Sequence, residues 1–326
     1  MLKYIAKIER FFLRQLNILL YGGKRVSKNL PLMTGDELNQ YIYDALSSDA
    51  PLMVARYGGV ELDAALYTYI CQLPLRKRYK IYIQRKNPYL RHDATYAQTL
   101  MNPLCNNAGF FPNDISLLKP FGEQLLYKDT PECSCCCCSP WVNEDLVMPF
   151  FNSQIKFGKL NNLEPYDYDK PWSRALAGKK VLVVHPFAKS IESQYARRDL
   201  LWENPEVLPE FELKTIKAVQ SVADEKVPFR DWFEALHHMK QQMDAIDYDV
   251  AIIGCGAYGF SLAAHAKRSG KQAIHLGGAT QILFGIKGKR WDEMPAVNKF
   301  YNDYWVYPLP EETPKNAHKV EGGCYW

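Results

Sequence analysis

The stretch "DYDVAIIGCGAYGFSLAAHAKRSGKQAIHLGG", residues 247–278, holds two apolar runs separated by a glycine-rich turn and a helix-like segment. The pattern predicts a buried strand at Val250–Ile253, a helix at Ala257–Ser269 and a second strand at Gln272–Leu276. Two strands joined by a helix form a parallel pair, because the helix carries the chain back to the starting edge of the sheet. This stretch therefore favours an α/β fold.

Gly254, Gly256 and Gly259 have the spacing of a dinucleotide-binding fingerprint. Glycines there allow a tight turn, a close approach of backbone N–H groups to a diphosphate, and close packing of the helix on its strand. The acidic residue that would bind the ribose about 20 positions further on is missing; His275 and Gly277 lie in that region. The turn predicts a diphosphate site, and three alternatives stay open: an NAD(P)-binding oxidoreductase or epimerase, a non-catalytic nucleotide-binding protein, and a purely structural turn.

The same strand, loop and helix rhythm recurs along the chain. Further strands are predicted at Leu52–Ala55, Lys180–Val184 and within 212–221, and further helices from Val60, from Lys189 and around Trp232–Ala245. Strands that alternate with helices predict a Rossmann-like, mostly parallel, doubly wound sheet with helices on both faces. We expect it to occupy residues 29–326, with a candidate hinge in the Pro- and Asn-rich part near 161–171.

The N-terminal segment, residues 1–28, carries seven Lys or Arg against one Glu. Its net charge is +6, whereas the whole chain has +4, so the remainder sums to −2. That balance argues against a broad nucleic-acid-binding surface. Apolar side chains share one stripe of a helix: Ile5, Ile8, Phe12, Leu16 and Leu19. We expect a basic amphipathic helix, which either binds an anionic membrane surface through residues 1–25 or packs on its own domain.

The chain holds no stretch of about 18 apolar residues, and its N-terminus lacks the apolar core of a signal peptide. The sequence therefore predicts a cytoplasmic protein, peripheral at the inner face of the membrane if the N-terminal helix binds lipid. Nine cysteines include four in a row, without the paired spacing of a zinc site. We expect reduced thiols, with Ser134–Cys138 as a buried strand.

Ligands of such sheets bind outside the carboxyl ends of the strands. The segments expected there, within 56–61, 185–190, 254–259 and 275–291, combine glycine turns with Arg, Lys and His, which suits a phosphorylated ligand. The candidate binding residues are Arg56, Gly58, Gly254, Gly256, Gly259, Lys189, Ser190, His275, Gln281, Lys287, Lys289 and Arg290.

The segment Arg56-Tyr57-Gly58-Gly59-Val60-Glu61 resembles the Arg-Phe-Gly-Asp-Gly-Glu motif of the GT-D-fold glycosyltransferases, a bacterial family formerly known as a domain of unknown function. The stretch near 249–277 resembles the second glycine-rich unit of the same family. The resemblance implies a Rossmann-like fold and a hexosyltransferase-type enzyme. Such an enzyme would transfer a sugar from a nucleotide-sugar donor to a glycan or lipid-linked acceptor, in surface polysaccharide or glycoprotein assembly.

The resemblance also implies an Asp-x-Glu pair associated with a divalent metal, Mn²⁺ or Mg²⁺, and with the donor. In this sequence Gly59 stands at the Asp position, which leaves Glu61 as the one matching carboxylate. One carboxylate is a poor cage for such an ion, so we expect activity without a metal. Sugar transfer benefits from a general base, and the candidates are His185 and Glu61, each near the end of a predicted strand.

Overall fold

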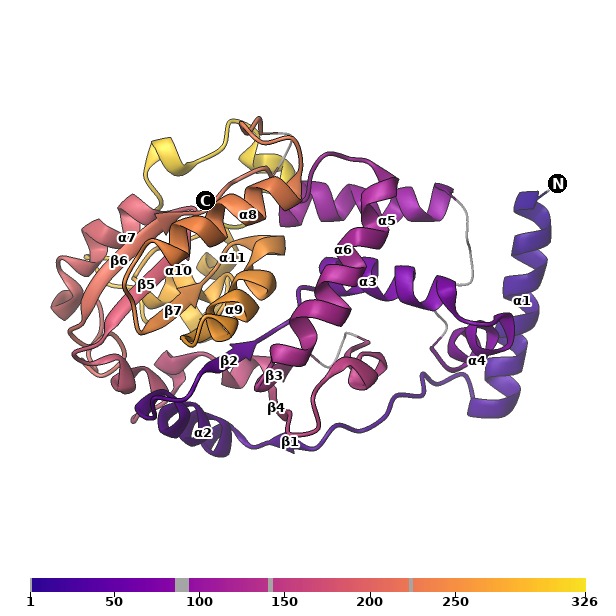
Figure 1. Ribbon diagram of the computed structural model, residues 1–326, viewed down its shortest axis with the longest axis horizontal. Helices are drawn as coiled ribbons and strands as arrows, with labels where there is room; N and C mark the ends of the chain where they lie inside the picture. The colour runs from indigo at the N-terminus through magenta and orange to yellow at the C-terminus, as the bar shows by residue number, and fades with distance from the viewer. Residues whose placement is uncertain (1, 86–93, 140–142, 223–224) are drawn as a thin grey trace.

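A computed structural model describes residues 2–85, 94–139, 143–222 and 225–326 (Figure 1). Its centre is one eight-stranded sheet with the order β1-β4-β3-β2-β8-β7-β5-β6, and every pair of neighbours is parallel. The strands are β1 (Leu32–Met33), β2 (Leu52–Ala55), β3 (Cys135–Cys138), β4 (Lys156–Lys159), β5 (Lys180–His185), β6 (Glu212–Lys217), β7 (Val250–Ile253) and β8 (Gln272–His275).

Helices cover both faces of the sheet. The α-helices of the described residues, not all of which touch the sheet, are α1 (Leu2–Tyr21), α2 (Gly35–Ser47), α3 (Gly59–Gln72), α4 (Leu75–Arg85), α5 (Ala94–Ala108), α6 (Leu118–Glu123), α7 (Ala188–Tyr195), α8 (Trp232–Asp244), α9 (Gly259–Arg268), α10 (Ala279–Leu283), α11 (Lys289–Asp292) and α12 (Pro295–Asn298). Apolar side chains of α3, α5, α6, α8 and α9 form the core on one face, and those of α2, α7 and α10 help to form the core on the other. The predicted doubly wound α/β fold is confirmed.

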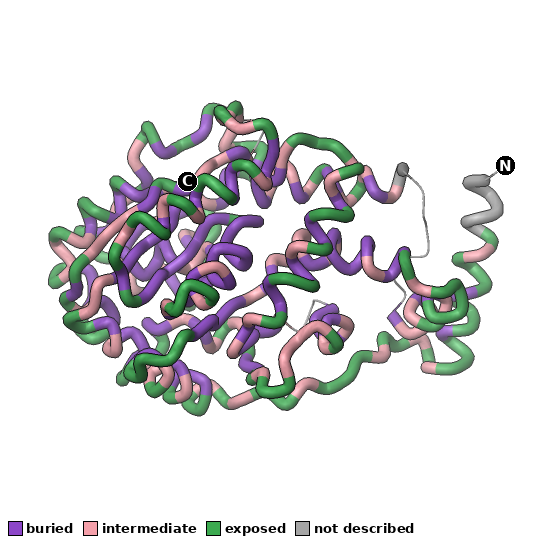
Figure 2. Tube along the Cα trace, viewed as in Figure 1, coloured by how far each residue is buried: buried purple, intermediate pink, exposed green. Residues whose placement is uncertain are grey.

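The strands are apolar on both sides because both faces of the sheet are covered. Met53 and Ala55 of β2 belong to one core, and Leu52 and Val54 belong to the other. Figure 2 shows the buried residues gathered along the sheet and the helices that face it. The cysteine run forms β3, whose four side chains are all buried, so the predicted cysteine strand is confirmed.

The predicted elements agree closely with the observed ones. The boundaries of β2 and β7 match the prediction, and the helix expected at Ala257–Ser269 divides into a short 3-10 turn at Gly256–Tyr258 followed by α9. Residues 161–171, the candidate hinge, bury Leu163 and Tyr166 in one of the two cores. The proposed domain boundary after residue 28 stays a prediction.

The N-terminal helix α1 lies at one end of the molecule beside α4 and away from the sheet (Figure 1). Within residues 8–21, only Leu13 and Asn17 are buried. None of the described helices is long and apolar enough to cross a lipid bilayer.

The connections after the central strands diverge at the carboxyl edge of the sheet. β2 and β7 lead to α3 and α9 on one face, whereas β5 and β8 lead to α7 and α10 on the other. Neighbouring strands whose connections leave to opposite faces open a crevice between them. The fold thus places such a crevice at the ends of the four adjacent strands β2, β8, β7 and β5.

Candidate functional site

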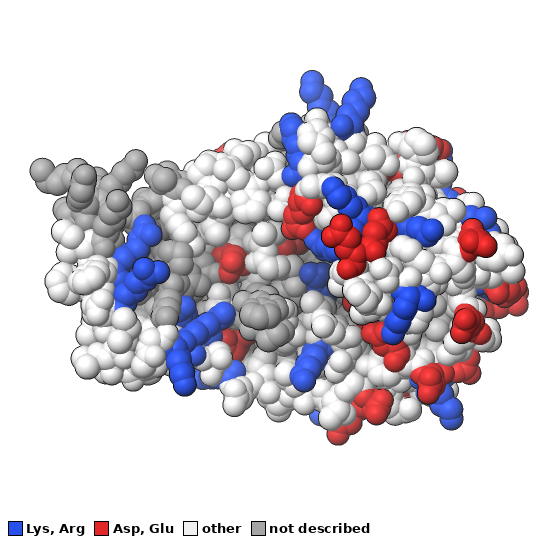
Figure 3. Space-filling model, turned by 180° about the vertical axis from the view of Figure 1, so that it is seen from behind, with Lys and Arg blue, Asp and Glu red and all other residues white. Residues whose placement is uncertain are grey.

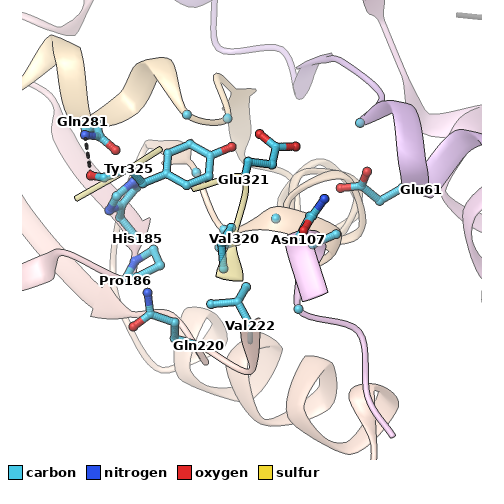
Figure 4. A pocket seen from close by; sticks show the side chains of 18 of the residues that line it. Glu61, Asn107, His185, Pro186, Gln220, Val222, Gln281, Val320, Glu321 and Tyr325 are labelled. Atoms are coloured by element: carbon cyan, nitrogen blue, oxygen red, sulfur yellow. Dashed lines mark hydrogen bonds between the residues drawn. The ribbon is translucent and has the colours of Figure 1, made fainter. Parts of the chain in front are cut away.

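A pocket of about 320 Å³ occupies this crevice (Figure 4). Each of the four adjacent strands contributes a residue at or just after its end: Arg56, His275, Gly254 and His185. The remaining walls come from the end of α5, the loop after β6 and the last residues of the chain. Those walls include Asn107, Ala108, Gly109, Val219, Gln220, Ser221, Val222, Val320, Glu321, Tyr325 and Trp326. The predicted loops after β2, β5, β7 and β8 therefore all line this pocket.

The turn between β2 and α3 explains the spacing of Gly58 and Glu61. Gly58 is the N-cap of α3, and a Cβ atom added there would overlap the Glu61 carboxylate, which folds back over the start of the helix. Burial raises the pKa of Glu61, and the negative charge of Glu321 raises it further. A hydrogen bond from the Glu61 backbone N–H and the positive charge of Arg56 lower the pKa in part. Figure 4 shows the Glu61 and Glu321 side chains pointing toward one another. Glu61 is thus a carboxylate with raised proton affinity inside the pocket.

Gly59 follows Gly58 in the same turn and also lines the pocket. A Cβ atom added at Gly59 would meet no atom within 4 Å, and its φ lies outside the left-handed region. A larger residue would therefore fit at position 59 without a steric clash, whereas none would fit at position 58.

Arg56 crosses the neighbouring turn between β8 and α10. Its Nη1 atom would lie 2.8 Å from a Cβ atom added to Gly277, which has a φ of +68°. The Arg56 Nε–H donates to the Tyr57 carbonyl at 3.4 Å. Among the described residues no ion pair engages Arg56. Its positive charge is available to an anionic ligand.

Gly254 lies where two turns touch. A Cβ atom there would come within 2.6 Å of both the Gly277 carbonyl oxygen and the Thr280 hydroxyl, and the Gly254 N–H already donates to Val184 at 3.0 Å. In the part of the chain that the structure describes, no hydrogen bond is found for the N–H groups of Cys255 and Gly256. The turn therefore offers two backbone donors at the pocket wall.

Gly256 is needed for packing against α5 as well as for the pocket wall. If the turn only faced a ligand, a larger side chain at Gly256 would point into open space and spare the fold. Instead, Gly256 has a φ of +54°, and a Cβ atom there would overlap the Ala108 carbonyl oxygen at the end of α5. Gly259 has a packing role too, because its Cβ would overlap the His275 ring. Both glycines let backbone segments approach closely.

His185 is held in one tautomer. Its Nδ1 accepts a hydrogen bond from the Phe187 N–H at 3.0 Å, so the neutral ring carries its proton on Nε2. Burial lowers the pKa of His185 to about 3, which keeps the ring neutral at physiological pH. The Cδ2 edge of the ring faces Gly254. This geometry makes His185 a hydrogen-bond donor toward a ligand and argues against the predicted role of general base.

His275 is buried at the end of β8 beside Gly259. Burial, together with the nearby charge of Arg56, lowers the pKa of His275 to about 3. A neutral ring cannot balance the charge of a phosphate, so His275 contributes shape and packing to the pocket wall.

The four predicted binding residues Lys189, Ser190, Lys287 and Lys289 do not line the pocket. The Glu312 carboxylate accepts hydrogen bonds from the Lys189 N–H at 2.8 Å and from the Ser190 N–H and hydroxyl, so it caps the first turn of α7. The Lys287 ammonium lies 5.2 Å from the centre of the Tyr301 ring. The Lys289 ammonium donates to the Gly322 carbonyl at 3.2 Å. These donors are engaged by the chain itself.

Gln281 lines the pocket in a role different from phosphate binding. Its Nε2 donates to the carbonyls of Lys287 at 2.9 Å and Tyr325 at 3.2 Å, and also to Ile286 (Figure 4). Its Oε1 is buried and has no partner among the described residues. An acceptor there suits an N–H or O–H group and repels a phosphate. Gln281 therefore anchors the C-terminal residues to the pocket wall.

The C-terminal segment 320–326 is one part of the site that the sequence did not predict, together with the end of α5 and the loop after β6. Arg290 donates to the Glu321 carboxylate, and its guanidinium lies 4.9 Å from the centre of the Tyr325 ring. Glu321 has a φ of +46°, unlike the other non-glycine residues of the described chain. The pair Gly322-Gly323, which follows at positive φ, was the one signal in the sequence that a tight turn brings the chain end back.

A divalent metal ion fits the described side chains poorly. They contain no group of three or more His, Cys, Asp or Glu positioned to hold an ion. Of the two facing carboxylates, Glu321 is paired with Arg290, and Gly59 supplies no oxygen.

No family model matches this sequence, and no curated protein matches it. A solved structure described as a selenomethionine-substituted domain of unknown function 1792 (DUF1792) is similar in fold over 94% of this chain and 98% of that chain. The sequence identity is 12%, and the TM-score is 0.40. A similarity of that size does not bear on the chemistry of the pocket.

Proposed function

We propose that this protein is a glycosyltransferase that moves a sugar from a nucleotide-sugar donor to a hydroxyl group of a glycan or lipid-linked acceptor, in bacterial surface polysaccharide or glycoprotein assembly. One observation carries the proposal: a single pocket combines the free N–H groups of the turn before α9 with the guanidinium of Arg56. Helix N-termini and oriented N–H groups bind phosphate oxygens, and a fixed cation balances their charge.

The reaction follows from these groups. The acceptor oxygen attacks the anomeric carbon of the donor, and the bond from that carbon to the diphosphate oxygen breaks. Negative charge grows on the departing diphosphate, where Arg56 and the N–H groups of Cys255 and Gly256 stabilise it without reorganising. The acceptor proton passes to the Glu61 carboxylate, whose raised pKa improves it as a base. The His185 Nε2–H donates a hydrogen bond to the donor.

The size and walls of the pocket suit such a ligand. A volume of about 320 Å³ lies at the lower end of the range for small-molecule sites. Tyr325 and Trp326 supply aromatic surface on which a base or a sugar ring can stack. The buried Gln281 Oε1 is an acceptor for a donor group of the ligand. The motif of residues 56–61 adds the resemblance to sugar transferases.

An NAD(P)-dependent oxidoreductase or epimerase is the competing function. β8 ends at the neutral, buried His275, at the place where an acidic residue would bind the adenosine ribose. A non-catalytic nucleotide-binding protein is the other alternative, and it requires a pocket that binds without turnover.

Calorimetry with UDP, GDP, ADP, NAD⁺ and NADP⁺ distinguishes these functions, followed by an assay of nucleotide-sugar hydrolysis. We expect a nucleoside diphosphate to bind and both dinucleotides to fail. Arg56→Ala should weaken diphosphate binding by about 10- to 100-fold, because a charge-assisted contact is lost. Lys189→Ala is the matched control, since Lys189 lies outside the pocket. Tight binding of NAD⁺, or equal effects of both variants, would refute the proposal.

A further inference from the structure

The outer surface of α1 exposes an apolar stripe. Seven large apolar side chains of this helix are between 40% and 79% exposed: Ile8, Phe11, Phe12, Leu16, Ile18, Leu19 and Leu20. At 100° per residue, Ile8, Phe12 and Leu19 lie within about 40° of one another around the helix. The buried Leu13 and Asn17 lie on the opposite side, where the Asn17 amide donates to the Ile83 carbonyl of α4 at 2.6 Å.

This orientation argues against the alternative in which α1 packs its apolar stripe on its own domain. A helix packed on its own domain would bury its apolar stripe and turn its charges to water. Here four residues of the predicted stripe, Ile8, Phe12, Leu16 and Leu19, are exposed, and the side chain of the fifth, Ile5, lies outside the described residues. Contiguous exposed apolar surface of this kind marks an interaction site.

The net charge of α1 and α4 indicates the partner. Residues 1–28 carry a net charge of +6, and α4 adds five Lys or Arg without any Asp or Glu. Six exposed basic residues of α1, of the turn directly after it and of α4 make no ion pair with other described residues: Arg10, Arg14, Lys24, Arg76, Lys77 and Lys80. Figure 3 shows Lys and Arg side chains at the end of the molecule that α1 and α4 form.

We propose that the exposed stripe of α1 and the six basic residues, together called the α1–α4 surface, bind the face of an anionic lipid membrane. The apolar side chains enter the boundary between headgroups and acyl chains, while the arginines and lysines contact lipid phosphates. The helix then lies in the plane of the membrane. α4 takes part through Leu75, which is 57% exposed, and through its basic first turn. The inference does not depend on the proposed reaction.

Flotation of the full chain with lipid vesicles tests the proposal. We expect recovery with vesicles of phosphatidylcholine mixed with phosphatidylglycerol, and little recovery with phosphatidylcholine alone. Recovery should fall between roughly 0.05 M and 0.5 M salt, since screening weakens the attraction of surface charges. Failure to float with the anionic vesicles would overturn the proposal.

Two double variants separate the contributions of the surface. Phe12→Glu with Leu19→Glu should abolish flotation, and Arg76→Glu with Lys77→Glu should lower vesicle affinity by at least about 25-fold, since each basic residue near an anionic surface contributes about fivefold. All four side chains are exposed, so the melting temperature should not change. Leu200→Glu and Lys159→Glu, at exposed positions outside the α1–α4 surface, are the matched controls.

Two outcomes would contradict the inference. Equal flotation of the stripe variant and the control variants would show that the stripe does not contact lipid. Light scattering that finds a dimer of the parent protein and a monomer of the stripe variant would show that a second copy of the chain covers the stripe instead.

Discussion

Gly256 and Gly59 both line the pocket and both lie in glycine turns, yet the structure predicts opposite results when each is changed to alanine. The Cβ atom of Gly256→Ala would come closer than 3.0 Å to the Ala108 carbonyl oxygen, on a backbone with a φ of +54°. The Cβ atom of Gly59→Ala would meet nothing within 4 Å.

The two costs at position 256 can be estimated separately. A residue with a Cβ atom in the left-handed region loses about 1–2 kcal/mol relative to glycine. Forcing a backbone carbonyl aside in a packed region adds about 1–3 kcal/mol. Gly256→Ala should therefore destabilise the protein by about 2–5 kcal/mol. Gly59→Ala removes a flexible residue from the first turn of α3 and should change stability by less than about 1 kcal/mol, in the stabilising direction.

Thermal melting monitored by circular dichroism measures the contrast. We expect Gly256→Ala to lower the melting temperature by about 4–20 °C, because each kcal/mol moves the melting temperature of a protein above 150 residues by roughly 2–4 °C. Gly59→Ala should melt at or slightly above the temperature of the parent protein. A Gly256→Ala protein that melts like the parent would refute the close approach of the turn to α5, and with it the observed shape of the pocket wall.

Three further outcomes are expected. Glu61→Gln should slow sugar transfer by about 100-fold or more. The parent protein should show a rate that rises with pH, because a base acts when deprotonated, and the midpoint of that rise should lie above pH 4.5, because burial raises the pKa of Glu61. The rise should be absent in Glu61→Gln. A limb near pH 6.5 that disappears in His185→Ala would instead make His185 the base. Excess EDTA should leave donor hydrolysis within about twofold, whereas complete loss restored by Mn²⁺ would show a metal at Glu61. Gln281→Met should lower the free energy of unfolding, measured in urea, by about 2–4 kcal/mol, because three carbonyls lose their hydrogen-bond donor. An unchanged urea midpoint would contradict the anchoring role of Gln281.

The sequence predicts the central strands well because each is a short, continuous apolar run followed by a glycine or a polar turn. β2, β5, β7 and β8 are buried on both faces, and that burial is what the apolar runs express. Strand β4, which lies between β3 and the edge strand β1, lacks this signal. In β4, Lys156 and Lys159 are exposed and only Phe157 and Gly158 are buried, so the run is too short and too polar to identify.

The residues of the site also fall into a group that the sequence predicts and a group that it does not. Residues directly after the central strands were predicted because parallel strands present their ends at one edge, and Arg56, His185, Gly254 and His275 do line one pocket. The far wall was not predicted, because the chain reaches it from the end of α5, the loop after β6 and the C-terminus. No local pattern specifies which distant segment closes a crevice.

The C-terminal residues also explain why several predicted phosphate ligands are not free. The N-terminus of a helix at Lys189 and Ser190 attracts an anion, but the sequence does not show whether that anion is a ligand or a carboxylate of the protein itself. In the structure the Glu312 carboxylate accepts hydrogen bonds from the Lys189 N–H and the Ser190 hydroxyl, and the Glu321 carboxylate forms an ion pair with Arg290. Two of the expected anion sites are thus satisfied by carboxylates of one terminal segment. A bound diphosphate is then left with Arg56 and the N–H groups of the turn before α9, which line the same pocket.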